Sequence, residues 1–360
     1  MASIRALLLL PPPPTPPTPS DLRGAFYDPI RHIIQSLNRS INDGAVSTTL
    51  HVALPYPETS PEQRSTRAQS FEATQRLVAG VYSLLAAIYD EESVGLVAAP
   101  LIDSRLVLFD DTKPSGGAVA CVFDLRSLAN PKQAWSHVYS VEGEPGETTY
   151  RRFRHLSDAQ WTHECVKGGL AVHRPGRSQA VRRDSLAHHR SDDAVAHASV
   201  VAGGSFYDLH FTNRLLLTMA LFLVEPRAEG QDGPRRVVLG VFRDGGSADA
   251  LVAWRERCAR VVGFLLDVLG PFAALAEGGS GGVMGRSVAA RYKMAVPSLS
   301  LAIECVAISD WSELALLERD ATAVVVSSEG GGDVRGMNVS REAKGWGSLQ
   351  TLTTSMASLE

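Results

Sequence analysis

The sequence predicts an α/β protein, and three features of the chain indicate this class. Short apolar, β-branched segments alternate with longer amphipathic ones, which is the pattern of strands joined by helices in a mainly parallel sheet. The alternation occurs twice, and a stretch rich in Arg, His and Ser separates the two occurrences. The length of 360 residues also suits two domains of ordinary size. We therefore expect an N-terminal α/β domain (1–160), a linker (161–198) and a C-terminal α/β domain (199–360).

The first half begins with a predicted buried strand that ends at a proline tract, Pro11–Pro19. We expect this tract to be a surface connector, with binding to an SH3-type partner as the alternative, because polyproline is stiff and extended. The remaining elements follow from apolar periodicity. They are strands at Ile4–Leu10, Thr48–Pro55, Arg105–Phe109, Val119–Asp124 and Trp135–Glu142, and helices at Asp21–Leu37, Glu62–Tyr89 and Glu147–Leu156. The loops of this half contain no cluster of nucleophile, base and glycines, which favours a structural or regulatory role.

The second half repeats the alternation after a strand that begins near Val200 and a helix that begins at Arg214. The later strands are expected at Arg236–Phe242, Leu299–Ile308 and Ala321–Ser327, and the helices at Ala248–Leu269 and Glu313–Glu318. Short right-handed crossovers between such strands give a Rossmann-like parallel sheet.

Composition excludes several classes of function. A formal net charge of −4 argues against a general nucleic-acid binder, which should carry a basic excess. The apolar run Ala6–Leu10 is too short for a secretory signal, and no stretch approaches the ~20 apolar residues of a membrane span. The four cysteines lie far apart without a Cys-x-x-Cys pair, which favours free thiols. We expect a cytoplasmic protein that binds neither membranes nor nucleic acid.

Two motifs are set aside. Gly278–Gly282 matches the Gly-x-Ser-x-Gly pattern of serine hydrolases but follows a predicted helix instead of a strand, so we expect a flexible loop. The histidines of the linker region match no common metal-ligand spacing, and we expect no protein-bound metal; they are His173, His188, His189 and His197.

The stretch Ser199–Val224 is the most informative part of the chain. An apolar strand turns at Gly203-Gly204, passes through a polar loop that contains His210, and enters an apolar helix. In α/β proteins, a ligand often binds at the carboxyl end of a strand, where a glycine turn and a polar loop lead into a helix. The free N–H groups of the helix N-terminus favour an anion, typically a phosphate, at that place.

Four segments in this half, taken in order, resemble a known family. GGSFYDLHFTNRLLL resembles the GG-T-F-D-x-L-H-x-G-H-K-x-L-L segment of eukaryotic (fungal-type) phosphopantetheine adenylyltransferases, which belong to the HxGH (cytidylyltransferase-like) nucleotidyltransferase superfamily. The segments VVLGVFRD, Ala307–Asp310 and Val324–Trp346 resemble later segments of the same family. The chain departs from the first segment at Tyr207, Thr212 and Asn213, which stand for an Asp, a Gly and the second His.

The resemblance implies a Rossmann-like (HUP-type) nucleotidyltransferase domain that transfers AMP from ATP, with Mg²⁺, to 4′-phosphopantetheine in coenzyme A biosynthesis. The catalytic residues implied are His210, Asn213 and Arg214, with Arg214 in place of a phosphate-binding Lys. The implied ligand-binding residues are Gly203, Gly204, Ser205, Phe206, Arg243, Ser327 and Glu329. The alternative is a catalytically inactive protein that binds nucleotide or coenzyme A, or a scaffold.

The C-terminal segment is the last point of comparison with the family. By resemblance the domain should end with a fifth strand, an I-S-S-T-x-I-R segment and a helix, whereas SLQTLTTSMASLE contains no basic residue. We therefore expect a domain truncated relative to the family, with a sheet edge left open and covered only in part by Leu349, Leu352 and Met356.

Overall fold

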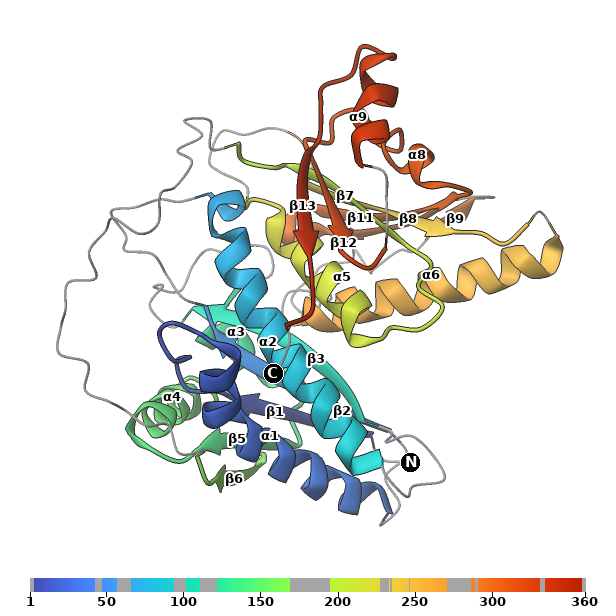
Figure 1. The fold of residues 1–360 in the computed structure, drawn as a ribbon. Coiled ribbons are helices and arrows are strands. Elements are labelled where there is room, and N and C mark those ends of the chain that lie inside the picture. Colours follow the sequence, from blue (N-terminus) through green and yellow to red (C-terminus); the bar gives the residue numbers. More distant parts are fainter. Residues whose placement is uncertain are drawn as a thin grey trace, which may run out of the picture.

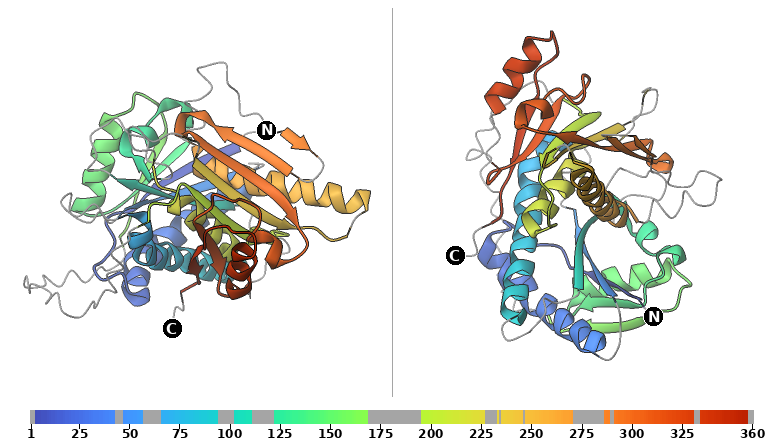
Figure 2. Two further views of the ribbon diagram at one scale, coloured as in Figure 1. Left: turned by 90° about the horizontal axis from the view of Figure 1, so that it is seen from above. Right: turned by 90° about the vertical axis from the view of Figure 1, so that its right-hand side faces the viewer.

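The structure is a computed structural model that describes most of the chain. The described residues are 3–42, 47–56, 66–93, 102–110, 122–168, 195–226, 233, 235–245, 247–270, 286–288, 291–330 and 334–357. Two β-sheets with helices around them make up this part of the chain, which is the predicted α/β class (Figures 1 and 2). None of the helices described is long and apolar enough to cross a membrane.

The first sheet has six parallel strands in the order β4-β3-β2-β1-β5-β6. The five strands predicted in this half are present as β1 (Ser3–Leu9), β2 (Ser47–Pro55), β3 (Ile102–Asp110), β4 (Val122–Asp124) and β5 (His137–Val141). β6 (Thr162–Val166) lies in the range that we expected to be linker. Only its last residue is buried, so this edge strand lacks the apolar run that would reveal it in the sequence. Residues 169–194 of the expected linker lie outside the described residues.

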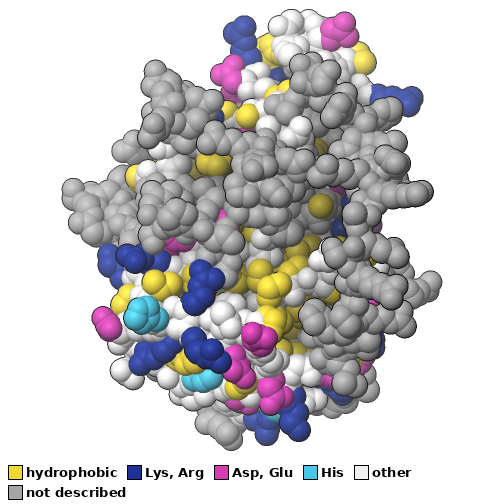
Figure 3. Space-filling model, turned by 90° about the vertical axis from the view of Figure 1, so that its left-hand side faces the viewer, with side chains coloured by type: hydrophobic (Ala, Val, Ile, Leu, Met, Phe, Trp, Pro, Cys, Tyr) yellow, Lys and Arg dark blue, Asp and Glu magenta, His cyan; other side chains and the backbone are white. Residues whose placement is uncertain are grey.

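The helices of this half lie on the two faces of the sheet. They are α1 (Pro19–Asn42), α2 (Arg67–Ser93), α3 (Leu125–Leu128), the short η1 (Pro131–Gln133) and α4 (Glu144–His155). α1 and α2 pack against each other, and α4 packs against β5 and β1. Figure 3 shows the surface on the side of α4, where charged side chains lie among hydrophobic ones.

The second sheet has seven strands in the order β13-β12-β7-β8-β11-β10-β9, of which the first five are parallel. Three of its strands, β7 (Ser199–Gly204), β8 (Arg235–Phe242) and β12 (Ala323–Ser327), were predicted within a few residues. β11 (Leu301–Ile308) begins slightly later than expected. The antiparallel strands β9 (Arg286–Val288) and β10 (Arg291–Val296) extend the sheet beyond β11 and were not predicted.

The expectation of a missing fifth parallel strand is wrong. β13 (Gln350–Thr354) pairs in parallel with β12, from Gln350 opposite Ala323 to Thr354 opposite Ser327. Only Leu352 and Thr354 of this strand are buried, so an edge strand with alternating exposure left little apolar signal in the sequence. Met356 packs against the core, as expected for the residues after Leu349.

The helices of the second half separate into two layers (Figure 1). α5 (Phe211–Leu223) packs against β7, β12 and α2, and α6 (Ala248–Val268) packs against β8, β11 and β3. The short helix α8 (Trp311–Leu314) contacts β7 and β11, and α9 (Val334–Glu342) packs against α8. The 3₁₀ turn η2 (Pro297–Leu299) joins β10 to β11.

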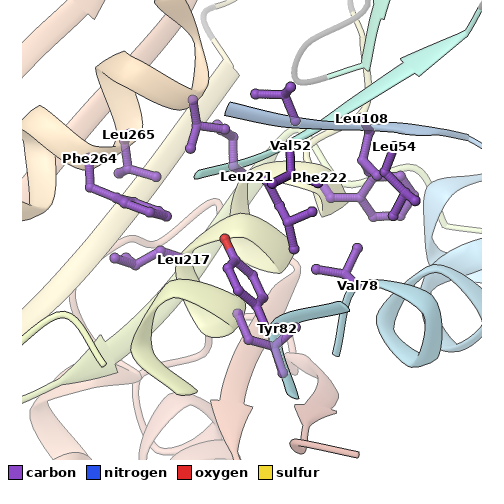
Figure 4. Close-up of a cluster of buried hydrophobic side chains, with 14 of the residues drawn as sticks. Val52, Leu54, Val78, Tyr82, Leu108, Leu217, Leu221, Phe222, Phe264 and Leu265 are labelled. Carbon is purple, nitrogen blue, oxygen red and sulfur yellow. The ribbon is translucent and has the colours of Figure 1, made fainter. Parts of the chain in front are cut away.

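One hydrophobic core extends through both halves. Val52 and Leu54 of β2, Tyr82 of α2, Leu221 of α5 and Phe264 of α6 belong to the same cluster of buried side chains (Figure 4). The right-hand view of Figure 2 shows α2 running alongside α5. A second, smaller cluster lies between the second sheet and α8 and α9, and includes Val201, Val324, Leu314 and Met337. Both faces of the central strands are therefore buried.

Polar contacts also join the halves. Gln75 Nε2 on α2 donates to the carbonyl of Ser355 at 2.6 Å, and Ser83 Oγ donates to the carbonyl of Ala357 at 2.9 Å. The segment after β13 is thus held along α2, which connects the edge of the second sheet to a helix of the first half.

Candidate functional site

The strand order changes direction at β7. The chain passes from β7 to β8 on one side, and later returns to place β12 on the other side. In open α/β sheets, ligands bind outside the carboxyl ends of the strands at such a point. The loops that follow β7 (205–210) and β12 (328–330) leave from these neighbouring strands, so the predicted residues of both loops lie at one edge of the sheet.

The two glycines at the end of β7 are packed by the protein's own side chains. A Cβ at Gly203 would lie 2.9 Å from Leu314 Cδ2 and 3.1 Å from Trp311 Cζ3, so this glycine allows α8 to approach the strand. A Cβ at Gly204 would lie 3.0 Å from the ring of Phe206, which is fully buried and has a positive φ of 50°. The two glycines therefore have a structural role in addition to any role in binding a ligand. Ser205, which follows them in the chain, is exposed.

Tyr207, which stands for the family's Asp, belongs to a small polar cluster. Its hydroxyl donates to Asp244 Oδ2, and Arg257 Nη1 also lies 3.2 Å from that oxygen. The Arg257 guanidinium is buried, lies 4.3 Å from the centre of the Tyr207 ring, and donates to the carbonyl of Phe242 at 2.7 Å. The hydrogen bonds from Tyr207 and Arg257 lower the pKa of Asp244, and the bond to Asp244 raises the pKa of Tyr207. Arg257 therefore lies at the carboxyl end of β8, and the Tyr207 ring covers its guanidinium.

His210 lies at the start of α5 and is exposed. It is the N-cap residue, but its side chain makes no capping hydrogen bond. Its Nε2 lies 3.7 Å from Asp208 Oδ2, and Asn213 Nδ2 donates to the backbone carbonyl of Asp208 at 2.7 Å. Asn213 therefore stabilises the turn before the helix, while the first N–H groups of α5 have no side-chain cap.

Arg214 points toward the first half. Its Nε donates to the carbonyl of Leu209 at 2.6 Å, its Nη1 donates to the carbonyl of Ser104 at 2.5 Å, and Nη1 lies 2.8 Å from Asp103 Oδ1. Residues of β3 therefore bind the side chain to which the resemblance assigns phosphate binding. Arg243, by contrast, is half-buried, and its side chain has no hydrogen bond or ion pair within the described ranges.

Ser327 and Glu329 form the turn after β12. The Ser327 hydroxyl accepts from the N–H of Glu329 at 3.3 Å, and the Ser327 carbonyl accepts from the N–H of Gly330 at 3.1 Å. The N–H of Ser328 donates to the carbonyl of Thr354 at 2.8 Å, which ties the turn to β13. The carboxylate of Glu329 is exposed to solvent.

The last matched segment has a structural role that sequence reasoning missed. The guanidinium of Arg341 is fully buried and donates to the carbonyls of Ala315, Glu318, Arg319, Ala321 and Gly347 at 2.6–3.0 Å. Asn338 exchanges two hydrogen bonds with the backbone of Leu349. An Arg in an amphipathic helix normally points to solvent, so the sequence gives no signal of this arrangement.

No group of three or more potential metal ligands occurs in the part of the chain that the structure describes. Two of the carboxylates at the carboxyl edge have other partners: Asp244 binds Tyr207 and Arg257, and Asp310 caps α8 by accepting from Ser312 N and Glu313 N. The hydrogen bond from the Ser312 side chain, followed by those backbone bonds, lowers the pKa of Asp310. Asp244 and Asp310 are therefore engaged within the protein, whereas the carboxylate of Glu329 is exposed.

A hollow of about 570 Å³ lies elsewhere, at the C-terminal end of α4. Its lining includes Tyr150, Arg151, Arg154, His155 and Asp158, and the side of the molecule that carries α4 shows Lys, Arg and His side chains gathered together (Figure 3). Arg151 pairs with Glu147 at 2.8 Å, and Arg154 donates to the carbonyl of Ala159 at 2.8 Å, so both cations serve the local fold. None of the predicted site residues lines this hollow.

Comparison with known proteins adds one finding. Residues 1–172 match a protein family described as a domain of unknown function (DUF8446), which covers the first sheet and leaves the second outside the match. No curated protein matched the chain. No solved structure matched it either.

Proposed function

We propose that the protein binds a phosphate-bearing nucleotide, or a phosphopantetheine-type ligand, at the carboxyl ends of β7 and β12, as a relative of the adenylyltransferases. The observation that carries the proposal is the reversal of strand order at β7, because it brings the loops after β7 and β12 to the place where open α/β sheets bind ligands. The four ordered sequence segments that resemble the adenylyltransferases support the choice of ligand.

The groups at this edge suit an anion. α5 has 13 residues, begins without a side-chain cap, and carries the exposed His210 at its start. Free N–H groups and the helix dipole favour a phosphate there. The exposed Ser205 and the half-buried Ser327 supply hydroxyls, and Arg243 is a cation without another partner among the described residues.

The same edge is poorly equipped for efficient adenylyl transfer. Transfer requires fixed positive groups that neutralise charge on the reacting phosphate. Arg214 is held by Asp103 and Ser104, and Asn213 by the carbonyl of Asp208. The loss of one preorganised donor typically reduces the rate about 10²–10³-fold. We therefore propose a protein that binds nucleotide and turns it over slowly or not at all.

The test is a calorimetric titration of the whole protein with ATP and Mg²⁺, with 4′-phosphopantetheine and with coenzyme A. We expect saturable binding of at least one of them, and about fivefold to tenfold weaker binding in His210→Ala, because a hydrogen bond to a charged group is lost. His32→Ala is the matched control, since His32 is a partly exposed histidine of α1 that pairs with Glu164 far from this edge. Absence of saturable binding, or equal binding by both variants, would show that the site is elsewhere.

Pyrophosphate release from ATP plus 4′-phosphopantetheine separates binding from catalysis. Release at the rate of the His210→Ala variant is the result expected of a binding protein. Release that is fast in the natural chain and falls in His210→Ala, but not in His32→Ala, would establish adenylyl transfer and contradict slow or absent turnover.

A further inference from the structure

A second polar centre lies in the core between the first sheet and the end of α6. The registers of β1, β2 and β3 place Arg5 beside Thr49, and His51 between Leu7 and Arg105. Alternate residues of a strand point to the same face, so Arg5, His51 and Arg105 lie on one face of the sheet. α6 packs against β3 on this side, and Arg105 Nη2 lies 3.1 Å from Asp267 in the last turn of α6.

Several buried polar atoms at this centre have no hydrogen-bond partner. They are both ring nitrogens of His51, both amide atoms of Gln133 and Nε of Arg105. His51 is 2% exposed and Gln133 is 0% exposed, so solvent at the surface does not satisfy them. The carbonyl of Asp267 lies near the His51 ring without hydrogen-bond geometry. Buried polar groups are nearly always paired, and a group of unpaired ones indicates a bound species.

These side chains converge on one point at the end of α6. The His51 and Trp135 rings are 5.0 Å apart, and the Arg5 guanidinium lies 4.9 Å from the centre of the Trp135 ring. Gly270 is the second residue after α6, and a Cβ there would lie 2.9 Å from Arg5 Nη2 and 3.7 Å from Gln133 Oε1. Arg5 and Gln133 therefore meet beside a residue that has no side chain.

The charges at this centre leave Arg5 without a direct counter-ion. Asp103 pairs with Arg105 at 2.6 Å and with Arg214 at 2.8 Å, and Asp267 pairs with Arg105 at 3.1 Å. The Arg5 side chain makes no hydrogen bond or ion pair with any described residue, although Asp267 is close enough to influence it. The unpaired donors are Arg105 Nε, Gln133 Nε2 and one nitrogen of His51, to which the Arg5 guanidinium adds several N–H groups; the unpaired acceptors are Gln133 Oε1 and the other nitrogen of His51.

We propose that this centre binds a small oxyanion of the size of phosphate or a carboxylate, held by Arg5, His51 and Gln133. A carboxylate offers acceptors only, and a phosphate offers mainly acceptors with a P–OH that can donate to Gln133 Oε1. Either matches the excess of donors, and its charge balances Arg5. The walls are the rings of Trp135 and Phe264, the latter 4.8 Å from the Arg105 guanidinium. The site joins the first sheet to α6, so its occupation stabilises the contact between the two halves.

The experiment measures binding of inorganic phosphate to the full chain by phosphorus NMR line width, and thermal unfolding at constant ionic strength. We expect saturable broadening, and a midpoint that rises with phosphate but not with chloride. Gln133→Met and Arg5→Met, which keep much of the side-chain volume, should bind phosphate at least about tenfold more weakly. Arg39→Gln should bind it as the natural chain does, because Arg39 is an exposed residue in the last turn of α1 and belongs to neither proposed site.

The outcomes separate this site from its alternatives. Phosphate binding that is equal in all four proteins would reveal a surface site and overturn the proposal. An absence of saturable binding, with Gln133→Met more stable than the natural chain, would show that the centre holds only water or nothing. ATP titrations of Arg5→Met test the other site, since a nucleotide at the carboxyl edge of the second sheet should be bound with unchanged affinity.

Discussion

Asp244 contributes a negative charge at the carboxyl edge of the second sheet. It accepts hydrogen bonds from Tyr207 and Arg257, and it is exposed. Asp208 and Glu329 are also exposed at this edge, whereas Arg257 is buried beneath Tyr207. An incoming phosphate therefore meets these carboxylates beside Arg243 and the N-terminus of α5, and Asp244 is the carboxylate that pairs with the covered arginine.

Neutralising Asp244 should strengthen the binding of ATP. We expect Asp244→Asn to bind ATP about threefold to tenfold more tightly, since a like charge is removed and Arg257 loses its carboxylate partner. Asp249→Asn is the control, because Asp249 is an exposed residue of the first turn of α6 and its change alters net charge equally. Titration calorimetry at fixed ionic strength measures both, and equal affinities would show that Asp244 does not face the ligand.

His51 should make the stability of the protein sensitive to pH. Burial, followed by the charges of Arg5 and Arg105, lowers the pKa of His51 well below its ordinary value of 6.5. The folded protein then binds the proton less readily than the unfolded chain, so this contribution is complete above the unfolded pKa and is lost as pH falls below it. From about pH 7.5 to about pH 5.5 the free energy of unfolding should fall by ~1 kcal/mol through this residue.

The measurement compares urea unfolding of the natural chain with that of His51→Leu at the two pH values. We expect a smaller decrease in His51→Leu. Part of the decrease should remain, because burial also lowers the pKa of His197, which is hydrogen-bonded to Thr322 and Gln350. An unchanged pH dependence in His51→Leu would mean that the histidine is not neutral and buried as described.

The sequence predicted individual site residues only where chemistry follows from residue type in a loop. The strand, turn and helix pattern placed His210 after a strand, and the resemblance added Ser205 and Ser327; the loops that contain them lie at one edge of the sheet. The partners of Arg214 could not be predicted, because Asp103 and Ser104 lie on a strand of the other half. Arg257 was missed for the same reason: it lies within a regular amphipathic helix, and only the packing of α6 brings it beneath Tyr207.

At the scale of elements, α9 depends on one side chain. Arg341 supplies hydrogen bonds to five carbonyls of the loops that join α8 to β12 and α9 to β13. The Arg341 side chain is fully buried, so water does not compete for its guanidinium. The conformation of the loop between α8 and β12 therefore depends on Arg341 of α9.

Arg341→Met should lower the free energy of unfolding by about 3 kcal/mol or more, because buried carbonyls would lose their donor. Arg335→Met is the matched control, since Arg335 is an exposed residue of the same helix. Chemical denaturation of the two variants measures the difference. A similar loss in both would indicate that the five hydrogen bonds contribute little.

The accuracy of the predicted elements follows burial. Strands β1, β2, β7 and β8, whose central residues are buried on both faces, were predicted from their apolar runs. β6 and β13 lie at sheet edges and have exposed residues, so they resemble loops in the sequence. For this reason β13, the fifth parallel strand of the second sheet, was not predicted.

At the scale of the whole molecule, the two sheets should unfold together. The main hydrophobic cluster contains residues of β2, α2, α5 and α6, and Arg67 of α2 donates to the carbonyl of Phe222 on α5 at 2.9 Å. Opening either half would expose apolar surface of the other. We expect peptides from β1–β3 and from β7–β8 to show the same free energy of opening in hydrogen exchange.

Leu221→Ala tests this coupling, since Leu221 of α5 is fully buried between the halves (Figure 4). The change should lower the opening free energy of both sheets by about 2–4 kcal/mol. Val252→Ala on α6, where Val252 is 54% exposed, should leave both unchanged. A decrease confined to peptides of the second sheet would show that the halves open independently.

The strand order of the second sheet also has a consequence for the folding rate. β7 pairs with β8, and β8 with β11, over shorter separations in the chain than β12, which must return from far along the chain to pair with β7. β13 then pairs with β12 at the edge of the sheet. Loop closure over such a distance costs entropy before any pairing compensates for it. Pulse-labelled refolding should therefore find amides of β8 protected early and those of β12 and β13 protected late, so the edge of β7 would be open to association with other chains for most of the reaction.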